Sequence, residues 1–233
     1  MNLLQRSYTK ELLDEDDIPF EDIRQNMKEL NVINSWLGGH AITLNGFKQI
    51  LGKRKAITVC EIGCGGGDNL HAIVKYCIKK NIAINCIGID IKPSCIEYAK
   101  QQWSYPQQAT WVADDYRNAG FETKPDIIFS SLFCHHFTED ELAYQMTWMK
   151  RNAAVGFFIN DLQRHILAYY SIKVLTRLFS SSYLVQNDAP LSVTRGFSKA
   201  DWIHIFNKAG IHQYTIQWKW AFRYLITCFN AQG

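Results

Sequence analysis

Hydrophobic and polar positions along the chain form two alternating kinds of block. Short, mostly apolar runs occur at residues 57–59, 83–90, 110–112, 125–131 and 153–159. Runs of this length are typical of strands that are buried on both faces of a parallel sheet. The stretches between them space apolar residues three or four positions apart, as amphipathic helices do. This alternation predicts an α/β fold with a doubly wound parallel sheet.

The N-terminal part of the chain is predicted to be helical after a polar, acidic start at residues 1–17. From Phe20 to Leu37 apolar residues recur at threes and fours, so this helix must pack on something. Gly38-Gly39-His40 is either a plain glycine stop signal or a hinge. A second short helix follows up to Leu51, and we expect residues 1–55 to form a helical lid.

The simple alternation stops after the fifth predicted strand. Residues 162–179 have the pattern of one long amphipathic helix. Its predicted apolar side consists of Leu162, Ile166, Leu167, Tyr170, Val174, Leu175 and Leu178. Residues 190–197 are expected to be a loop over the same end of the sheet. We interpret residues 162–197 as a helical cap that covers a substrate, and a basic helix lying on a membrane surface is the alternative.

The C-terminal part is predicted to complete the sheet. Ser198 is an N-cap residue for a helix that stops at Gly210. Two late strands, at 213–218 and 221–227, should form an antiparallel hairpin at the sheet edge. Residues 56–161 then form the core, and residues 198–233 add the strands that bring the sheet to seven.

Composition changes this picture little, but it excludes several classes of protein. The chain has 233 residues, 47% of them hydrophobic and 20% charged, which fits one globular core. A net charge of +3 is too small to imply a nucleic-acid partner. No run of 18 apolar residues occurs, so we expect no stable membrane insertion and a cytoplasmic protein. Its seven cysteines lack metal-ligand spacing, so we expect reduced core residues and no metal site.

A glycine-rich turn lies between the first strand and the helix that follows it. The segment has the pattern E-x-G-x-G-x-G, formed by Glu61, Gly63, Gly65 and Gly67. Glycines allow a positive φ and a close approach of the backbone to a ligand at a helix N-terminus. Counted from Gly63, the sixth position is Asp68 rather than glycine, which disfavours a dinucleotide-binding dehydrogenase.

Polar residues follow the next strands at the same end of the sheet. Asp90 ends the second strand, 27 residues after Gly63 (90 − 63), where a carboxylate can accept hydrogen bonds from both ribose hydroxyls. Its neighbour Ile91 is a further cofactor-binding candidate. Asp114 and Asp115 end the third strand: we expect one to meet an adenine amino group and prefer Asp114, while Asp115 is alternatively a helix N-cap.

These features together resemble the class I S-adenosylmethionine-dependent methyltransferases, whose motif I the glycine segment matches. The block from Asp126 through Ser130 to His136 is similar to motif IV of small-molecule enzymes such as the ubiquinone and menaquinone C-methyltransferases. It lacks Asn-Pro-Pro-Tyr, which counts against amino-methylation of nucleic-acid bases. The resemblance implies a Rossmann-like sheet with S-adenosyl-L-methionine bound by Glu61, the glycines, Asp90, Asp114 and the Ser130 end of the fourth strand.

A narrower resemblance concerns the second half of the chain. Residues 160–169, 175–180 and 190–197, together with Leu37-Gly38-Gly39, look like bacterial methyltransferases associated with type III polyketide synthases and aromatic pigment pathways. This resemblance implies secondary metabolism, with methyl transfer to a phenolic or quinol oxygen of a small aromatic acceptor.

Candidate residues for that chemistry lie next to the fourth and fifth strands. His135 and His136 could act as a general base, or could be packed structural histidines. Arg164 and Arg195 could bind a substrate carboxylate or phenolate, although Arg164 could instead pair with Asp161 across one helical turn. Asp161 and Tyr169 complete the substrate-binding candidates, and Tyr169 could equally be a packing residue.

Two other functions are compatible with the same motifs. One is C-methylation of a quinone-type ring, and the other is a catalytically silent protein that binds S-adenosylmethionine and acts by interaction. The residues do not identify the acceptor, and they do not fix the oligomeric state.

Overall fold

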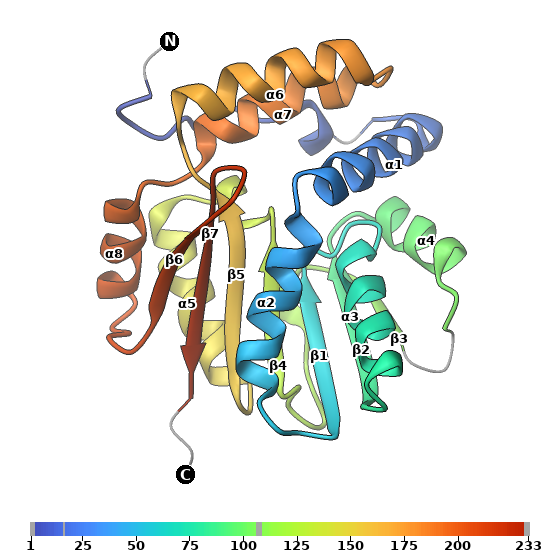
Figure 1. Ribbon diagram of the computed structural model, residues 1–233, viewed down its shortest axis with the longest axis vertical. Helices are drawn as coiled ribbons and strands as arrows, with labels where there is room; N and C mark the ends of the chain where they lie inside the picture. The colour runs from blue at the N-terminus through green and yellow to red at the C-terminus, as the bar shows by residue number, and fades with distance from the viewer. Residues whose placement is uncertain (1–2, 16, 106–108, 231–233) are drawn as a thin grey trace.

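A seven-stranded sheet forms the centre of the computed structural model, which describes residues 3–15, 17–105 and 109–230 (Figure 1). The strands are β1 (Ala56–Ile62), β2 (Ala83–Asp90), β3 (Ala109–Ala113), β4 (Ile127–Ser131), β5 (Gly156–Leu162), β6 (Thr215–Lys219) and β7 (Arg223–Phe229). Their order in the sheet is β3-β2-β1-β4-β5-β7-β6. The first five strands are parallel, and β7 is antiparallel to both β5 and β6. The predicted doubly wound sheet with a C-terminal hairpin is confirmed.

Helices cover both faces of the sheet. On one face, α2 (Gly39–Leu51) packs on β4, β5 and β7 and α3 (Asp68–Lys79) packs on β2, through an apolar cluster that includes Phe47 and Leu70. On the other face, α5 (Glu139–Asn152) and α8 (Lys199–Lys208) pack through a cluster that includes Met146 and Trp202. Helix α4 (Pro93–Gln102) packs on β2 and β3. All seven cysteines are buried free thiols, as predicted.

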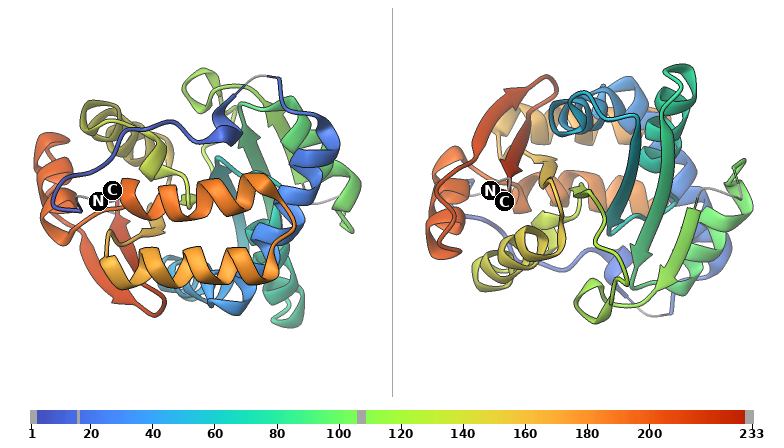
Figure 2. Two further views of the ribbon diagram at one scale, coloured as in Figure 1. Left: turned by 90° about the horizontal axis from the view of Figure 1, so that it is seen from above. Right: turned by 90° about the horizontal axis from the view of Figure 1, so that it is seen from below.

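Three helices lie over the carboxyl ends of the parallel strands (Figure 1). They are α1 (Phe20–Trp36), α6 (Ile166–Phe179) and α7 (Tyr183–Arg195). Viewed from above, α6 and α7 run side by side across the top of the molecule (Figure 2). Glu29 of α1 joins the three helices, because its carboxylate accepts hydrogen bonds from the hydroxyl of Ser180 and from the backbone N–H of Ser181 in the α6–α7 turn.

Single turns η1 (Leu12–Asp14), η3 (Tyr116–Asn118) and η4 (Cys134–His136) lie between the longer elements. Within the ranges that the structure describes, no helix is long and apolar enough to cross a bilayer.

Two predictions for residues 162–197 are wrong. The long helix does not begin at Leu162: β5 continues to that residue because β7 pairs with it there, and α6 begins only at Ile166. Residues 190–195 are not a loop but the last part of α7, which contains Pro190 within the helix. The side chain of Asp188 anchors this helix, since it accepts hydrogen bonds from the backbone N–H groups of Leu12 and Leu13, both at 2.9 Å.

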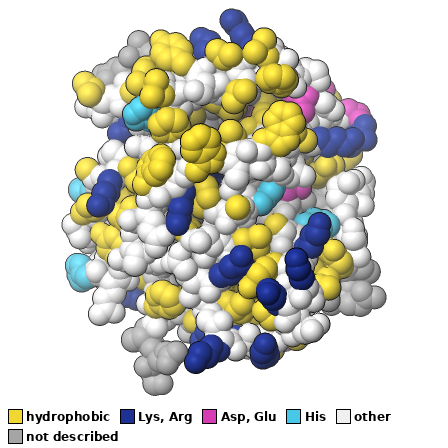
Figure 3. All heavy atoms as spheres, in the orientation of Figure 1, with side chains coloured by type: hydrophobic (Ala, Val, Ile, Leu, Met, Phe, Trp, Pro, Cys, Tyr) yellow, Lys and Arg dark blue, Asp and Glu magenta, His cyan; other side chains and the backbone are white. Residues whose placement is uncertain are grey.

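The predicted packing side of α6 is also largely wrong. Most of the residues assigned to it are exposed on the outer surface: Ile166, Leu167, Tyr170, Val174 and Leu178. The buried residues of α6 are instead Ala168, Ile172 and Thr176, while Leu175 faces the interior cavity. Hydrophobic side chains are correspondingly visible over the top of the molecule in Figure 3.

Candidate functional site

A large cavity lies between the carboxyl ends of the strands and the helices above them. Its volume is about 880 Å³, within the range of small-molecule sites. Residues of the segment 8–14, of α1, and of α6 and α7 close it from above. The predicted site residues that line it are Glu61, Gly63, Gly65, Asp90, Ile91, Asp114, Asp115, His135, His136 and Arg195.

Three glycines of the loop after β1 adopt positive φ angles. These are 66° at Gly63, 49° at Gly65 and 77° at Gly67, values that L side chains rarely adopt. A Cβ at Gly63 would lie 2.1 Å from the Phe133 ring, and one at Gly67 would lie 2.6 Å from Trp111. Gly67 therefore serves close packing behind the cavity, while Gly63 and Gly65 form its wall.

The carboxylate of Asp90 is held in place by the same loop. It accepts hydrogen bonds from the backbone N–H of Gly65 at 2.8 Å and from that of Lys92 at 2.9 Å. One bond goes to each oxygen, so each keeps a lone pair for a ligand hydroxyl. Burial raises the pKa of Asp90. Ile91, which follows it, is 65% exposed on the cavity rim.

Glu61 is fully buried at the bottom of the cavity. Its Oε1 accepts a hydrogen bond from the side-chain amide of Asn69 at 2.9 Å, whereas its Oε2 has no hydrogen-bond partner among the residues that the structure describes. Burial raises the pKa of Glu61 well above its ordinary value. Asn69 also contacts Nδ1 of His40 at 3.1 Å, and Nε2 of His40 lies 2.9 Å from Oδ1 of Asn31. This polar chain links helices α1 and α2 to the part of the cavity around the glycine loop.

The two aspartates after β3 have different surroundings. Asp115 accepts a hydrogen bond from the backbone N–H of Arg117 at 2.8 Å and also pairs with its guanidinium, which lowers the pKa of Asp115. It is thus the N-cap of η3, the alternative considered for it. Asp114 is exposed at the cavity and accepts a hydrogen bond from Asn118 at 2.9 Å. Both hydrogen bonds that it accepts from described residues, from Asn118 and from the backbone N–H of Asp115, go to Oδ1, so Oδ2 leaves room for a ligand donor.

At the end of β4, the serine that lines the cavity is not the one that was predicted. Ser130 is fully buried, and its hydroxyl lies 3.4 Å from Sγ of Cys134. The residue of this strand that lines the cavity is Ser131. Side chains alternate between the two faces of a strand, so only one of the two serines can point to the cavity side.

His135 lies between two carboxylates. Its Nδ1 is 2.8 Å from Asp161, its Nε2 is 3.5 Å from Glu11, and its side chain is 3% exposed. Burial alone would lower its pKa, but the two carboxylates outweigh burial and raise the pKa of His135 to about 9. His135 is therefore a cation at neutral pH. A protonated imidazole cannot accept a proton, so His135 is unsuited to be the general base.

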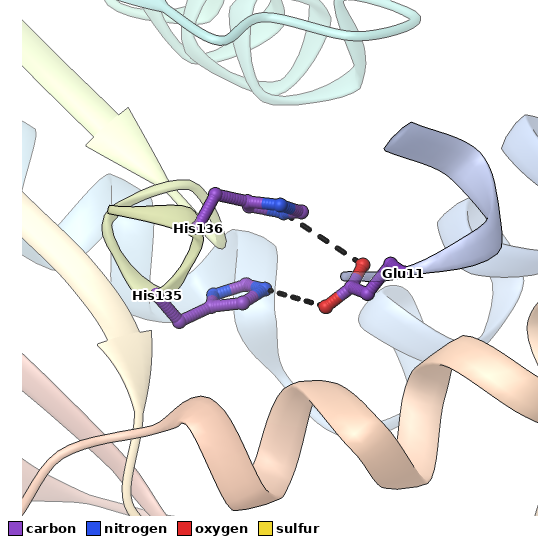
Figure 4. Close-up of side chains that lie close together, drawn as sticks. All are labelled: Glu11, His135 and His136. Atoms are coloured by element: carbon purple, nitrogen blue, oxygen red, sulfur yellow. Dashed lines mark ion pairs between the residues drawn. The ribbon is translucent and has the colours of Figure 1, made fainter. Parts of the chain in front are cut away.

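His136 is the more open of the two histidines, with 23% of its side chain exposed. Its Nδ1 lies 3.2 Å from Asp14 and its Nε2 lies 3.8 Å from Glu11. Figure 4 shows both imidazoles directed toward Glu11, which comes from the N-terminal segment. Burial would raise the pKa of Asp14, but contact with His136 lowers it overall. A carboxylate on one ring nitrogen fixes the orientation of the imidazole.

The same cluster has the composition of a possible metal site. Glu11, His135 and His136 each offer one ligand atom, and these atoms lie within 4.8 Å of one another. Two imidazoles and a carboxylate can hold a divalent ion. In this structure protonated His135 forms ion pairs with Glu11 through Nε2 and with Asp161 through Nδ1, and these pairs hold the cluster together.

The two arginine candidates serve mainly to connect segments of the chain. Arg195 donates to the backbone carbonyls of His135, His136 and Thr9 at 2.8–3.1 Å. It thereby ties α7 to the catalytic candidates and to the N-terminal segment. Its guanidinium also lies 3.4 Å from Asp14, so it reinforces the position of that carboxylate.

Arg164 does not form the ion pair with Asp161 that a helical turn would have allowed. The stretch around it is not helical, and its guanidinium instead contacts Asp201 at 2.9 Å and the carbonyl of Gly196 at 2.6 Å. Asp161 is fully buried and accepts hydrogen bonds from backbone N–H groups of Phe133, Cys134 and Leu162. It acts on the site through His135.

Tyr169 packs with the cap rather than facing the cavity. Its ring lies against Ala168, Ile172 and Val193, and Nζ of Lys173 lies 5.6 Å from the ring centroid. The α6 residues that line the cavity are Ala168, Ser171, Ile172 and Leu175. The surroundings of Tyr169 therefore fit a packing role rather than substrate binding.

Several residues at the cavity were not identified from the sequence. Glu11 and Asp14 belong to the polar, acidic start of the chain, and no local pattern connects them to His135 and His136. Arg223 carried no motif at all. Its only signal was its position at the start of the last strand, at the same end of the sheet as Asp90.

Comparisons with known proteins agree with this arrangement. Residues 59–155 match the family model described as a methyltransferase domain. A stretch of 80 residues is 30% identical to malonyl-(acyl-carrier protein) O-methyltransferase 1 of Ilyobacter polytropus. That stretch covers 34% of this chain and 28% of the relative.

Solved structures share the fold at lower identity. Human N-acetylserotonin methyltransferase, solved with S-adenosylmethionine, has a TM-score of 0.62 and 18% identity, with 92% of this chain and 57% of that chain covered. The plantazolicin methyltransferase, solved with S-adenosylhomocysteine, also has a TM-score of 0.62, with 16% identity over 89% of this chain and 99% of that chain. The chain therefore has the Rossmann-like methyltransferase fold, within which residues 59–155 match the methyltransferase-domain model.

Proposed function

We propose that the protein is an S-adenosylmethionine-dependent methyltransferase that acts on an oxygen of a small aromatic acceptor. The observation that carries this proposal is the continuity of the cavity. One space of about 880 Å³ joins the glycine loop, Asp90 and Asp114 to His136 and to an apolar region beneath the cap. A cofactor and an acceptor can meet in such a space without intervening water.

The cofactor half fits S-adenosylmethionine in three respects. The positive φ of Gly63 and Gly65 brings backbone close to the cavity, and Asp90 keeps a free lone pair on each oxygen. In addition, Oε2 of Glu61 is buried and has no partner in the described part of the chain. Asp114 would meet the adenine. When bound, the cofactor supplies a methyl group that is activated by the positive sulfur. The protein's task is then to hold the acceptor oxygen in line with that methyl group, and such alignment lowers the barrier substantially.

The acceptor half lies under the cap and is mostly apolar. Its lining residues include Ile33, Leu37, Leu162, Ile172, Val193, Trp218 and Phe222. Apolar and aromatic side chains with a few polar groups suit a small aromatic ligand. Residues 162–197 would cover this ligand and residues 1–55 would close the cofactor side. The resemblance of the cap to methyltransferases of type III polyketide synthase and pigment pathways supports a phenol or quinol.

His136 is the better of the two histidines for proton transfer. It reaches the cavity, and Asp14 at 3.2 Å from Nδ1 fixes its orientation. His135 carries its proton already and serves to hold Glu11 and Asp161. A phenol has an ordinary pKa of about 10, so removing its proton as it attacks increases the rate. We assign that role to His136, with Asp14 as its positioning carboxylate.

The test is a methyl-transfer screen with S-adenosylmethionine labelled with ¹³C in the methyl group. Catechols, resorcinols, alkylresorcinols and quinols are offered in turn, release of S-adenosylhomocysteine is quantified, and NMR locates the labelled carbon. A new methoxy resonance supports the proposal. A new aryl methyl resonance would make the protein a C-methyltransferase, and tight binding of S-adenosylhomocysteine without turnover of any acceptor would make it a silent binding protein.

A further inference from the structure

Arg223 is a buried cation that donates no side-chain hydrogen bond to any described residue. It is the first residue of β7, pairs in register with Leu162 of β5, and is 3% exposed. Its side chain lines the cavity, and its Nε and Nη1 are buried without a partner. A guanidinium has five N–H donors, and leaving them unsatisfied away from water is energetically costly.

Other buried arginines of this protein are satisfied in the ordinary way. Arg164 contacts Asp201 and backbone carbonyls, and Arg195 contacts three carbonyls. Even Arg6, which keeps one nitrogen unpaired, donates to the carbonyls of Arg195 and Phe137 at 3.0 Å. Arg223 is therefore an exception among residues of its own kind, and its partner is not among the described parts of the chain.

The nearest opposite charge does not take that place. Asp161 attracts Arg223 electrostatically, but its oxygens are occupied by His135 and by three backbone N–H groups. Burial lowers the pKa of Arg223 to about 10, so the guanidinium remains charged at neutral pH. The result is a fixed positive charge at the cavity wall, with Leu162 opposite it in β5, and this charge also acts on His40 of α2.

The position of Arg223 in the sheet indicates which ligand it faces. The sheet order β2-β1-β4-β5-β7 separates it by four strand spacings from Asp90, the residue assigned to the ribose. At about 4.8 Å per spacing this is roughly 19 Å across the sheet. Arg223 thus lies on the far side of β4, next to Leu162 and beneath the cap, in the half of the cavity assigned to the acceptor.

We propose that Arg223 binds a carboxylate of the methyl acceptor, so that the acceptor is an aromatic acid rather than a neutral phenol. A planar carboxylate matches the guanidinium fork and can accept two parallel hydrogen bonds. In a cavity with apolar walls such a pair selects strongly for the charged ligand, because a neutral analogue leaves the buried donors unpaired. The inference rests on the proposed function for the assignment of the acceptor half.

A pair of probes that differ only in the charged group tests the proposal. Binding of 3,4-dihydroxybenzoate and of 4-methylcatechol is measured by calorimetry in saturating S-adenosylhomocysteine, for the wild type and for Arg223→Met and Arg223→Lys. The wild type should prefer the acid. Arg223→Met should lose about 10- to 100-fold in affinity for the acid and none for 4-methylcatechol, and Arg223→Lys should lie between them. These measurements need no turnover, so they are independent of whether methyl transfer is detected.

Two further readouts decide between the alternatives. Thermal unfolding of the ligand-free protein should show Arg223→Met at least as stable as the wild type, because a buried unpaired charge is removed. If Arg223→Met is strongly destabilised, Arg223 is a structural residue and the proposal fails. It also fails if the wild type does not prefer the acid, or if the variant loses affinity for S-adenosylhomocysteine instead. That last result would assign Arg223 to the amino-acid carboxylate of the cofactor.

Discussion

Nδ1 of His135 lies 2.8 Å from the carboxylate of Asp161, and both side chains are buried. With a folded pKa of about 9 against an ordinary value of 6.5, His135 stabilises the protein fully below pH 6.5. This contribution declines as the pH rises through 9, because the folded protein then loses the extra proton. The pair thus makes stability pH-dependent on the alkaline side.

We predict that Asp161→Asn lowers the free energy of unfolding by about 3–5 kcal/mol near pH 6.5, since it leaves a buried cation without its main partner. The deficit should shrink between pH 6.5 and 10 as His135 becomes neutral in the wild type. Urea unfolding at several pH values measures this difference in the free energy of unfolding. Asp126→Asn is the matched control, because Asp126 accepts a hydrogen bond from the backbone of Thr58 rather than from a histidine. A deficit of Asp161→Asn that does not vary with pH would contradict the assignment.

Replacing His136 should separate catalysis from binding. His136→Asn is expected to lower kcat by about 10²- to 10⁴-fold, the usual range for loss of a general base, with affinity for S-adenosylhomocysteine unchanged. Asp14→Asn should lower kcat less, because it removes only the group that orients the imidazole. Steady-state kinetics on the acceptor found in the screen measures both effects. His204→Asn serves as control, since His204 is exposed and pairs with Glu139 away from the cavity. Full turnover by His136→Asn would leave proximity as the source of the rate.

Asp90 and Asp115 offer a comparison within the cofactor half. Asp90→Asn should weaken binding of S-adenosylhomocysteine by about 10- to 100-fold, because hydrogen bonds to a charged group are lost. Asp115→Asn should change it little, because that carboxylate is already paired with Arg117. Isothermal calorimetry measures both affinities, and circular dichroism checks that both variants keep the fold. Equal affinities for the two variants would remove the ribose assignment.

Gly63 should not tolerate a side chain. Gly63→Ala combines a left-handed φ of 66° with a Cβ only 2.1 Å from Phe133. We expect it to lower the free energy of unfolding by about 2–5 kcal/mol, from backbone strain and overpacking together. Gly120→Ala is the control, because no atom lies within 4 Å of its added Cβ. Thermal unfolding of both variants measures the difference, and similar stabilities would mean that the loop adapts easily.

The sequence predicted which polar strand ends meet at the cavity, because the signals for them are local. Strands buried on both faces are continuous apolar runs, and each ends at a polar residue at the same edge of the sheet. Glu61, Asp90 and Asp114 could therefore be placed together without knowing any contact. Ser130 was the exception: the choice between it and Ser131 depends on which face of β4 meets the cavity, and adjacent polar residues at a strand end do not reveal that.

The acceptor half depends on contacts between distant segments, which local patterns do not encode. Periodicity indicated that α6 has an apolar side, but not that this side faces outward. Pro190 looked like the start of a loop, yet Asp188 holds the helix through bonds to Leu12 and Leu13. Glu11 lies 124 positions before His135 (135 − 11) in the chain. Only the fold brings such residues together.

The position of η1 determines when His136 is held in place by its carboxylate partners and can act as the proposed base. Glu11 and Asp14 belong to the same short segment that closes the cavity from above, so any movement that admits a ligand past this segment also takes away the partners of His136. The conformation in which ligands exchange is then catalytically incomplete, and the complete one is sealed. Such an enzyme would protect its activated methyl group from water, because the segment that closes the site also positions His136.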